Sequence, residues 1–225
     1  MDAIKRNILL AVAPFATWIA MQSLLPATAW AYAARTVATA IVGIICLAAF
    51  KGFRNSKALK DIAGIKGLMG LGWGLAVAAL WIFPDSFEWY RTWLCWPLGS
   101  LPETAAASPY DPAVCGWTLT IVKLAGSAFV IAPVEEVFFR SFLYRWLQNG
   151  NYASVPLSRF DLSAFLWTVL LFTLEHDRPL VAALAGAIYG MLAVRHGLGC
   201  AIVAHVATNL ALGLHVVYHG VWGFW

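Results

Sequence analysis

Apolar residues fill most of this chain in long runs that are separated by short polar stretches. A helix needs about 20 consecutive apolar residues to cross a bilayer. The runs therefore predict about seven transmembrane helices, with six to eight as the range. They cover about residues 8–25, 33–50, 67–83, 117–147, 162–176, 179–194 and 200–218.

The composition supports the same fold class. Of the 225 residues, 61% are hydrophobic and only 12% are charged, whereas water-facing helices of a soluble domain need charged outer faces. The sequence shows no internal repeat and no linker. We therefore predict an all-α, polytopic helical membrane protein with a single integral membrane domain over residues 1–225.

The charged residues indicate how the chain is oriented. The loop between the second and third runs has one acid, Asp61, and five bases: Lys51, Arg54, Lys57, Lys60 and Lys66. Cytoplasmic loops of membrane proteins are rich in lysine and arginine. We expect a multi-pass protein of the cell inner (plasma) membrane with a cytoplasmic N-terminus. The net charge of +4 then reflects topology, and we expect no nucleic-acid partner.

Two features near the outer side leave alternatives open. The stretch Ala27-Thr-Ala-Trp-Ala31 resembles a signal-peptide cleavage site, but the preceding run is long enough to span, so we favour a retained first helix. Cys95 and Cys115 share the acidic loop at about residues 84–116. They could be bridged if that loop faces an oxidising compartment.

Small residues recur in two of the apolar runs. One run begins with the glycine-rich stretch Gly67-Leu-Met-Gly-Leu-Gly-Trp-Gly74, and another carries Ala182, Gly186 and Gly190 at four-residue spacing. Small residues on one helix face allow a neighbouring helix to approach closely. We therefore expect close helix packing at both places.

Three polar motifs lie inside apolar runs: Glu135-Glu-Val-Phe-Phe-Arg140, Phe172-Thr-Leu-Glu-His176 and His205-Val-Ala-Thr-Asn209. A charged side chain at the centre of a bilayer costs about 2.5 to 3.5 kcal/mol, so such residues usually have a function. The sequence therefore places the candidate site in the second half of the chain, with a motif-bearing core at about residues 118–214.

The spacing of these residues suggests hydrolytic chemistry. Glu136 and Arg140 are i,i+4 neighbours and can pair, whereas Glu135 lies about 100° round the helix without that partner. A carboxyl group removed from water becomes a stronger base. Peptide hydrolysis needs a base that activates water and donors that stabilise the oxyanion. We hypothesise that Glu135 and His176 activate the water, while His205 and Asn209 supply the donors.

Other polar residues in these helices have simpler interpretations. We expect Glu175 to face another side of its helix, near the membrane interface, and Lys123 to extend outward to the interface. Pro133, just before the two glutamates, is expected to kink its helix.

In this order, the three motifs resemble the CAAX-protease and bacteriocin-processing (CPBP) family of intramembrane endopeptidases, whose motifs are EExxxR, FxxxH and HxxxN or HxxxD. The resemblance implies a peptide-bond hydrolase whose substrate is a membrane-anchored or lipid-modified protein or peptide. It also implies catalytic roles for Glu135, His176, His205 and Asn209, with Glu136 and Arg140 supporting them. The first span, with Pro14-Phe-Ala-Thr-Trp18, also resembles a CAAX-protease-related subgroup associated with bacterial exosortases.

Several alternatives remain. Glu135, His176 and His205 could form a zinc site with one carboxylate and two imidazoles, although we favour a mechanism that uses no cofactor or metal. The same residues could form a proton or ion relay in a transporter, and a catalytically silent assembly factor could keep the fold for partner binding. Helix lengths also raise a difficulty, because they place His176 about 10 to 15 Å further toward the outer side than Glu135 and His205.

Overall fold

A computed structural model gives the fold of residues 2–49, 62, 64–93 and 108–225, and these described residues contain helices and no strand. The prediction of an all-α fold is therefore confirmed. Within the described part, six helices are long and apolar enough to cross a membrane, so the chain is a multi-pass membrane protein. They are α1 (Ala3–Leu24), α2 (Ala29–Ala49), α5 (Ile65–Asp85), a helix over Trp117–Trp146, α12 (Pro179–His196) and α13 (Leu198–His219).

The helix over Trp117–Trp146 is built from five consecutive segments. Two of them are π-helical, and they flank the two glutamates; a π-helical turn has a wider backbone and often occurs at functional sites. Pro133 lies in the first turn of α9, immediately after the first π-helical segment, and the chain stays helical through it. The segments are α8 (Trp117–Gly126), η1 (Ser127–Ile131), α9 (Ala132–Glu136), η2 (Val137–Leu143) and α10 (Tyr144–Trp146).

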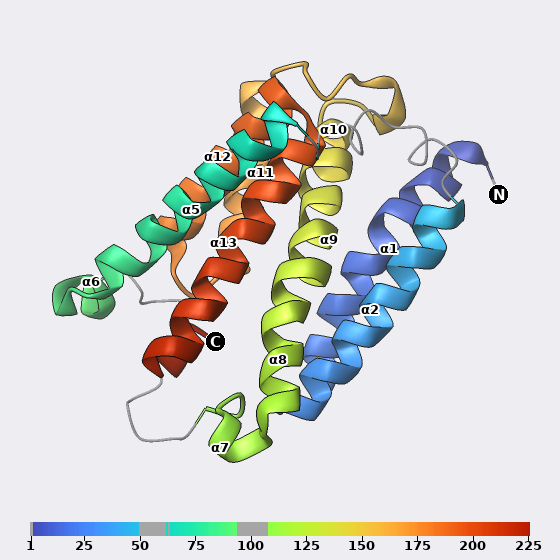
Figure 1. Ribbon diagram of the computed structural model, residues 1–225. Helices are drawn as coiled ribbons and strands as arrows, with labels where there is room; N and C mark the ends of the chain where they lie inside the picture. Colours follow the sequence, from blue (N-terminus) through green and yellow to red (C-terminus); the bar gives the residue numbers. More distant parts are fainter. Residues whose placement is uncertain (1, 50–61, 63, 94–107) are drawn as a thin grey trace.

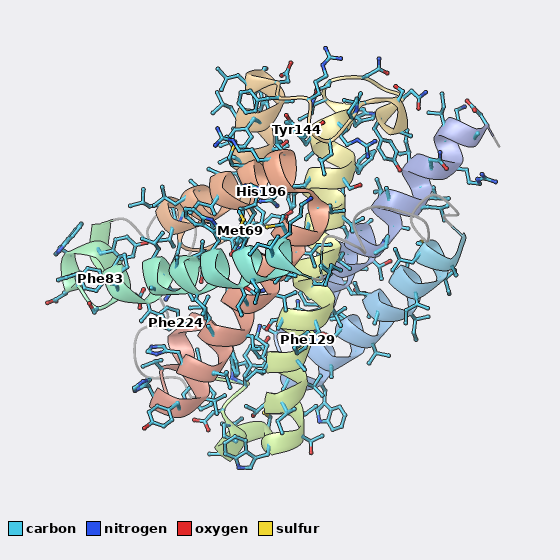
Figure 2. The ribbon with its side chains drawn as sticks, turned by 45° about the horizontal axis from the view of Figure 1, so that its top comes forward. Met69, Phe83, Phe129, Tyr144, His196 and Phe224 are labelled. Atoms are coloured by element: carbon cyan, nitrogen blue, oxygen red, sulfur yellow. The ribbon has the colours of Figure 1, made fainter. Side chains whose placement is uncertain are left out.

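This long helix lies in the middle of the bundle (Figure 1). The antiparallel pair α1 and α2 packs on one side of it, and α13 packs on the other side with α5, α11 and α12 beyond. We call its two ends the α7 end and the α10 end. Figure 2 shows Tyr144 and His196 toward the α10 end, and Phe224 toward the opposite end. The remaining short elements are α6 (Glu88–Trp93), α7 (Pro112–Cys115), η3 (Tyr152–Ser154) and η4 (Trp222–Phe224).

The fifth predicted span is shorter than expected. Helix α11 covers Leu162–Thr173, begins where the Asp161 side chain accepts from the amide of Ala164, and ends three residues before His176. Its 12 residues rise about 18 Å, which is too short to cross the hydrocarbon core. The prediction that this span extends to His176 is therefore wrong. The chain instead turns over residues 174–178 before α12 begins.

Both predictions of close packing at small residues are confirmed. On α5, a Cβ atom at Gly70 would lie 2.6 Å from the Cys200 carbonyl oxygen of α13, and one at Gly74 would meet the Ala204 carbonyl. On α12, Gly186 and Gly190 receive the rings of Phe172 and Phe165 from α11. Because these glycines have no side chain, α5 and α12 can pack closely against their neighbouring helices.

Two predictions fall on parts of the chain that are not described. The basic loop lies mostly within residues 50–61, and Cys95 lies within residues 94–107. The bridge between Cys95 and Cys115 therefore stays a prediction.

Candidate active site

The four residues predicted to be catalytic line one cavity. It has a volume of about 280 Å³, and its lining includes Glu135 from α9, His176 from the turn after α11, and His205 and Asn209 from α13. It extends from the middle of the bundle toward the α7 end, because Gln22 near the end of α1 and Trp225 near the end of the chain also line it. Residues separated by 74 positions in the chain therefore meet around one space.

Glu136 is fully buried and holds two partners at once. Its Oε1 atom lies 2.9 Å from His205 Nδ1 and 3.2 Å from Arg140 Nη1. Arg140, only 2% exposed, also donates from Nη2 to the Gly186 carbonyl oxygen at 3.2 Å. The predicted pairing of Glu136 with Arg140 is confirmed, and the contact with His205 adds a role in orienting the imidazole.

The imidazole of His205 is held in one orientation. A carboxylate only accepts hydrogen bonds, so Nδ1 of His205 donates to Glu136 and Nε2 faces the opposite way. There it lies 3.8 Å from Glu135 Oε2, which is too long for a hydrogen bond. The Tyr189 ring stacks on the imidazole with the ring centres 4.7 Å apart, and the Tyr189 hydroxyl donates to Thr208 at 2.7 Å.

Glu135 is the less engaged of the two glutamates. It is 9% exposed and lines the cavity, whereas Glu136 does not. The Oε2 atoms of both glutamates are buried without a hydrogen-bond partner among the described residues, but Oε1 of Glu136 is held by Arg140 and His205. An unpaired buried carboxyl oxygen is costly. Its position in the cavity wall fits an atom that binds a water molecule or a substrate group.

His176 reaches the cavity because α11 ends early. Its Nδ1 atom lies 2.8 Å from the Phe172 carbonyl oxygen, and since a carbonyl only accepts, Nε2 is left as the free ring nitrogen. The Phe172 ring lies 4.5 Å from the His176 ring and 5.9 Å from the His205 ring, centre to centre. The expected depth mismatch between the two histidines is therefore removed by the turn that follows Thr173.

Asn209 is fixed from the long helix. Its Nδ2 atom donates to the Ser127 carbonyl oxygen at 3.0 Å, in the π-helical segment η1. An amide nitrogen carries two hydrogens, so one N–H remains for a ligand. His205 and Asn209 both line the cavity, and Asn209 is anchored one turn closer to the α7 end.

The alternative zinc site would be formed by Glu135, His176 and His205. Nowhere in the described part of the chain do three His, Cys, Asp or Glu side chains lie close enough together to hold a metal ion. The Nδ1 atoms of His176 and His205 are hydrogen-bonded, which leaves Nε2 of each ring toward the cavity. This is also the arrangement of histidines that bind a metal through Nε2, so the zinc alternative stays a prediction.

The cavity also contains residues that the sequence analysis assigned elsewhere or did not identify. Lys123 and Glu175, expected at the membrane interface, both line it, as do Arg35 from α2 and Arg178 from the turn after α11. The sequence spacing could not have placed Lys123, because 12 residues at about 100° each put it about 120° round a regular α-helix from Glu135. The π-helical segment η1 lies between them, and its wider turn brings both residues to the cavity.

The family comparison agrees with this geometry. A family model described as Rce1-like, type II CAAX prenyl endopeptidase Rce1-like, matches residues 117–211. The matched segment contains all three motifs, which confirms the resemblance found in the sequence. No curated protein and no solved structure matches the chain. Over residues 117–211, this chain is therefore similar to the Rce1-like family of type II CAAX prenyl endopeptidases.

Proposed function

We propose that this protein is an intramembrane endopeptidase that hydrolyses a peptide bond of a membrane-anchored or lipid-modified protein or peptide. The family match supports protease activity within the membrane. The observation that carries the proposal is that Glu135, and not Glu136, lines the cavity that also contains His176, His205 and Asn209. The proposed partners are the bilayer and one protein or peptide substrate.

The proposed reaction uses these residues in two roles. Glu135, with the free Nε2 atom of His176, takes a proton from a water molecule as its oxygen attacks the scissile carbonyl carbon. Asn209 Nδ2 donates to the oxyanion, and Nε2 of His205 does so when it carries a proton. The C–N bond then breaks, and the proton held by Glu135 passes to the leaving amine.

Burial in an apolar bundle is what makes this arrangement effective. Inside the helix bundle, the attraction between the donors and the developing negative charge is screened less than in bulk solvent. Glu136 and Arg140 act indirectly, because they fix His205 without lining the cavity. This division of roles explains why two adjacent glutamates are needed.

The proposal is tested by comparing protein termini. Membranes from cells that express the wild-type chain or the Glu135→Gln variant are compared by mass spectrometry of new N- and C-terminal peptides. We expect a small set of termini that is present with wild type and absent with Glu135→Gln. Glu88→Gln on α6, outside the cavity lining, is the matched control and should leave this set unchanged. Identical termini in all three samples would refute the protease proposal and favour a transporter or an assembly factor.

A further inference from the structure

Two cations lie at the end of the cavity that is remote from Glu135. The Arg35 guanidinium carbon is 4.3 Å from the centre of the Trp18 ring and 4.9 Å from that of Tyr32, and Lys123 Nζ is 4.2 Å from the Tyr32 centre. Lys123 Nζ also lies 4.7 Å from the centre of the Tyr110 ring. Two like charges are thus held against faces of one aromatic cluster.

Neither cation has an acidic partner among the described residues. The acids in the cavity lining are Glu135, Glu175 and Asp177, and none of them forms an ion pair with Arg35 or Lys123. Asp177 lies 3.6 Å from Arg178 instead. The Nε atom of Arg35 is buried and makes no hydrogen bond. Both side chains are partly buried in the cavity wall, and a charge that is partly removed from water is stabilised by an opposite charge, so the two cations suit a negatively charged group.

The position of this site is set by the long helix. Lys123, Ser127, Ile131 and Glu135 recur at four-residue spacing, and all four line the cavity. Thr36, next to Arg35 in the chain, faces Gly126, so Arg35 lies nearly level with Gly126. A rise of about 1.5 Å per residue puts the cation pair about 14 to 18 Å from Glu135 along the helix. An extended peptide covers this distance with about four or five residues.

We propose that Arg35 and Lys123 bind a carboxylate of the peptide substrate, about four or five residues from the bond that is cleaved. The proposal rests on the proposed endopeptidase function and adds where the substrate is recognised. A free C-terminal carboxylate and an acidic side chain share the required chemistry. A peptide carboxylate fits better than a lipid phosphate, because the site is continuous with the wall that carries Glu135. Trp18, Tyr32 and Tyr110 hold the two cations apart and in place.

The test uses synthetic peptides with the purified full chain in detergent. Each peptide carries one S-farnesylated cysteine followed by two to eight aliphatic residues, and is made with a C-terminal carboxylate, as the C-terminal amide, and as the amide with glutamate in the last position. Cleavage is followed by mass spectrometry, and binding is measured by fluorescence anisotropy with the Glu135→Gln chain. For the wild type we expect kcat/KM for the free acid to exceed that for the amide by about tenfold or more, mainly through KM.

Variants of the two cations decide what causes this preference. Lys123→Gln and Arg35→Gln should each remove most of the preference by lowering cleavage of the free acid more than that of the amide, and thermal unfolding in detergent shows whether the variants fold. Lys123→Arg keeps the charge and should keep the preference, and Arg195→Gln, an exposed cation on α12, is the matched control. Rescue of the amide by a terminal glutamate would identify a side-chain carboxylate as an equally good ligand.

The outcomes separate this inference from the proposed function. If the acids and amides are cleaved equally and bind equally, the carboxylate site is refuted and the protease proposal stands. If no peptide is cleaved but the acids bind Glu135→Gln more tightly than the amides, the site stands and the endopeptidase proposal is weakened. If Lys123→Gln and Arg35→Gln lower acid and amide cleavage equally, the two cations only stabilise the fold, and the site is again refuted.

Discussion

Glu135 and Glu136 are neighbours in the chain but differ in what surrounds them. Glu136 is fully buried, and its Oε1 atom pairs with Arg140 and accepts from His205. The Oε2 atom of each glutamate is buried without a hydrogen-bond partner in the described structure, but Glu135 lines the cavity and Glu136 does not. Glu136 therefore holds its neighbours in place, whereas Glu135 can meet a ligand. The two glutamates should therefore respond differently to the same substitution.

We predict that Glu136→Gln destabilises the protein and that Glu135→Gln does not. Removing one charge of a buried pair leaves the other uncompensated, which typically costs about 3 to 5 kcal/mol. In Glu136→Gln, Arg140 would lose its ion pair and keep its hydrogen bond to the Gly186 carbonyl oxygen. For Glu135→Gln we expect a change below about 1 kcal/mol, because no hydrogen bond to Oε2 is lost. Thermal unfolding of the purified variants in detergent measures both.

Glu135→Gln and Glu136→Gln should also differ in their effect on peptide cleavage. Glu135→Gln should abolish cleavage in a folded protein, whereas Glu136→Gln should lower cleavage through misplacement of His205. A Glu136→Gln variant as stable as the wild type would show that the pair with Arg140 contributes little. Full activity of that variant would show that the orientation of His205 does not matter.

For the helices, the sequence predicted which faces pack closely better than it predicted where each helix ends. Glycines at Gly70 and Gly74 indicated a close helix contact, and the structure places α13 there. Helix α11 was predicted too long because its end was placed at the stop signal Asp177-Arg-Pro179, whereas the helix ends at Thr173, before the polar residues Glu175 and His176. The early end depends on the turn before Pro179, where Arg178 pairs with Asp85 of α5 at 2.8 Å, a contact between residues 93 positions apart.

The contact between α5 and α13 helps to position His205, and this can be tested by substitution. Thr208 of α13 donates to the Gly74 carbonyl oxygen at 2.9 Å and accepts from Tyr189, whose ring stacks on His205. A Cβ atom at Gly74 would lie 2.7 Å from the Ala207 Cβ atom. Gly74→Ala should therefore separate the helices and destabilise the protein by about 1 to 3 kcal/mol, with loss of cleavage.

Gly72→Ala is the matched control for this prediction. A Cβ atom at Gly72 meets nothing within 4 Å, and alanine favours a helix over glycine by up to about 1 kcal/mol. We expect Gly72→Ala to unfold at the same or a slightly higher temperature and to keep full activity. Equal effects of the two substitutions would mean that the contact between α5 and α13 does not position His205.

For the whole molecule, the sequence identified the residues that meet, but not the space they enclose. Charged motifs in apolar helices are visible in the sequence because they are costly there, and all three motifs contribute to one cavity. The cation pair could not be predicted in this way. Arg35 and Lys123 are far apart in the chain, and they come together only because α2 packs against α8.

The direction of the cavity follows from the ends of the helices that line it. The lining extends toward the α7 end, whereas Lys5, Arg145 and Arg195 lie near the α10 end of their helices and Arg159 lies in the loop before α11. Lysine and arginine concentrate on the cytoplasmic side of membrane proteins. We therefore propose that the α10 end and the N-terminus are cytoplasmic, and that substrates enter from the outer side.

This orientation predicts which positions a membrane-impermeant maleimide can reach. In a chain whose four native cysteines are replaced by serine, Gln22→Cys, an exposed position in the cavity lining near the end of α1, should be labelled in intact cells. Ser154→Cys, an exposed position in η3 near the α10 end, should be labelled only after the membrane is permeabilised. The reverse pattern would place the cavity on the cytoplasmic side, because the two positions lie toward opposite ends of one bundle. The basic residues would then contradict the charge rule, and an outer-side substrate would be excluded.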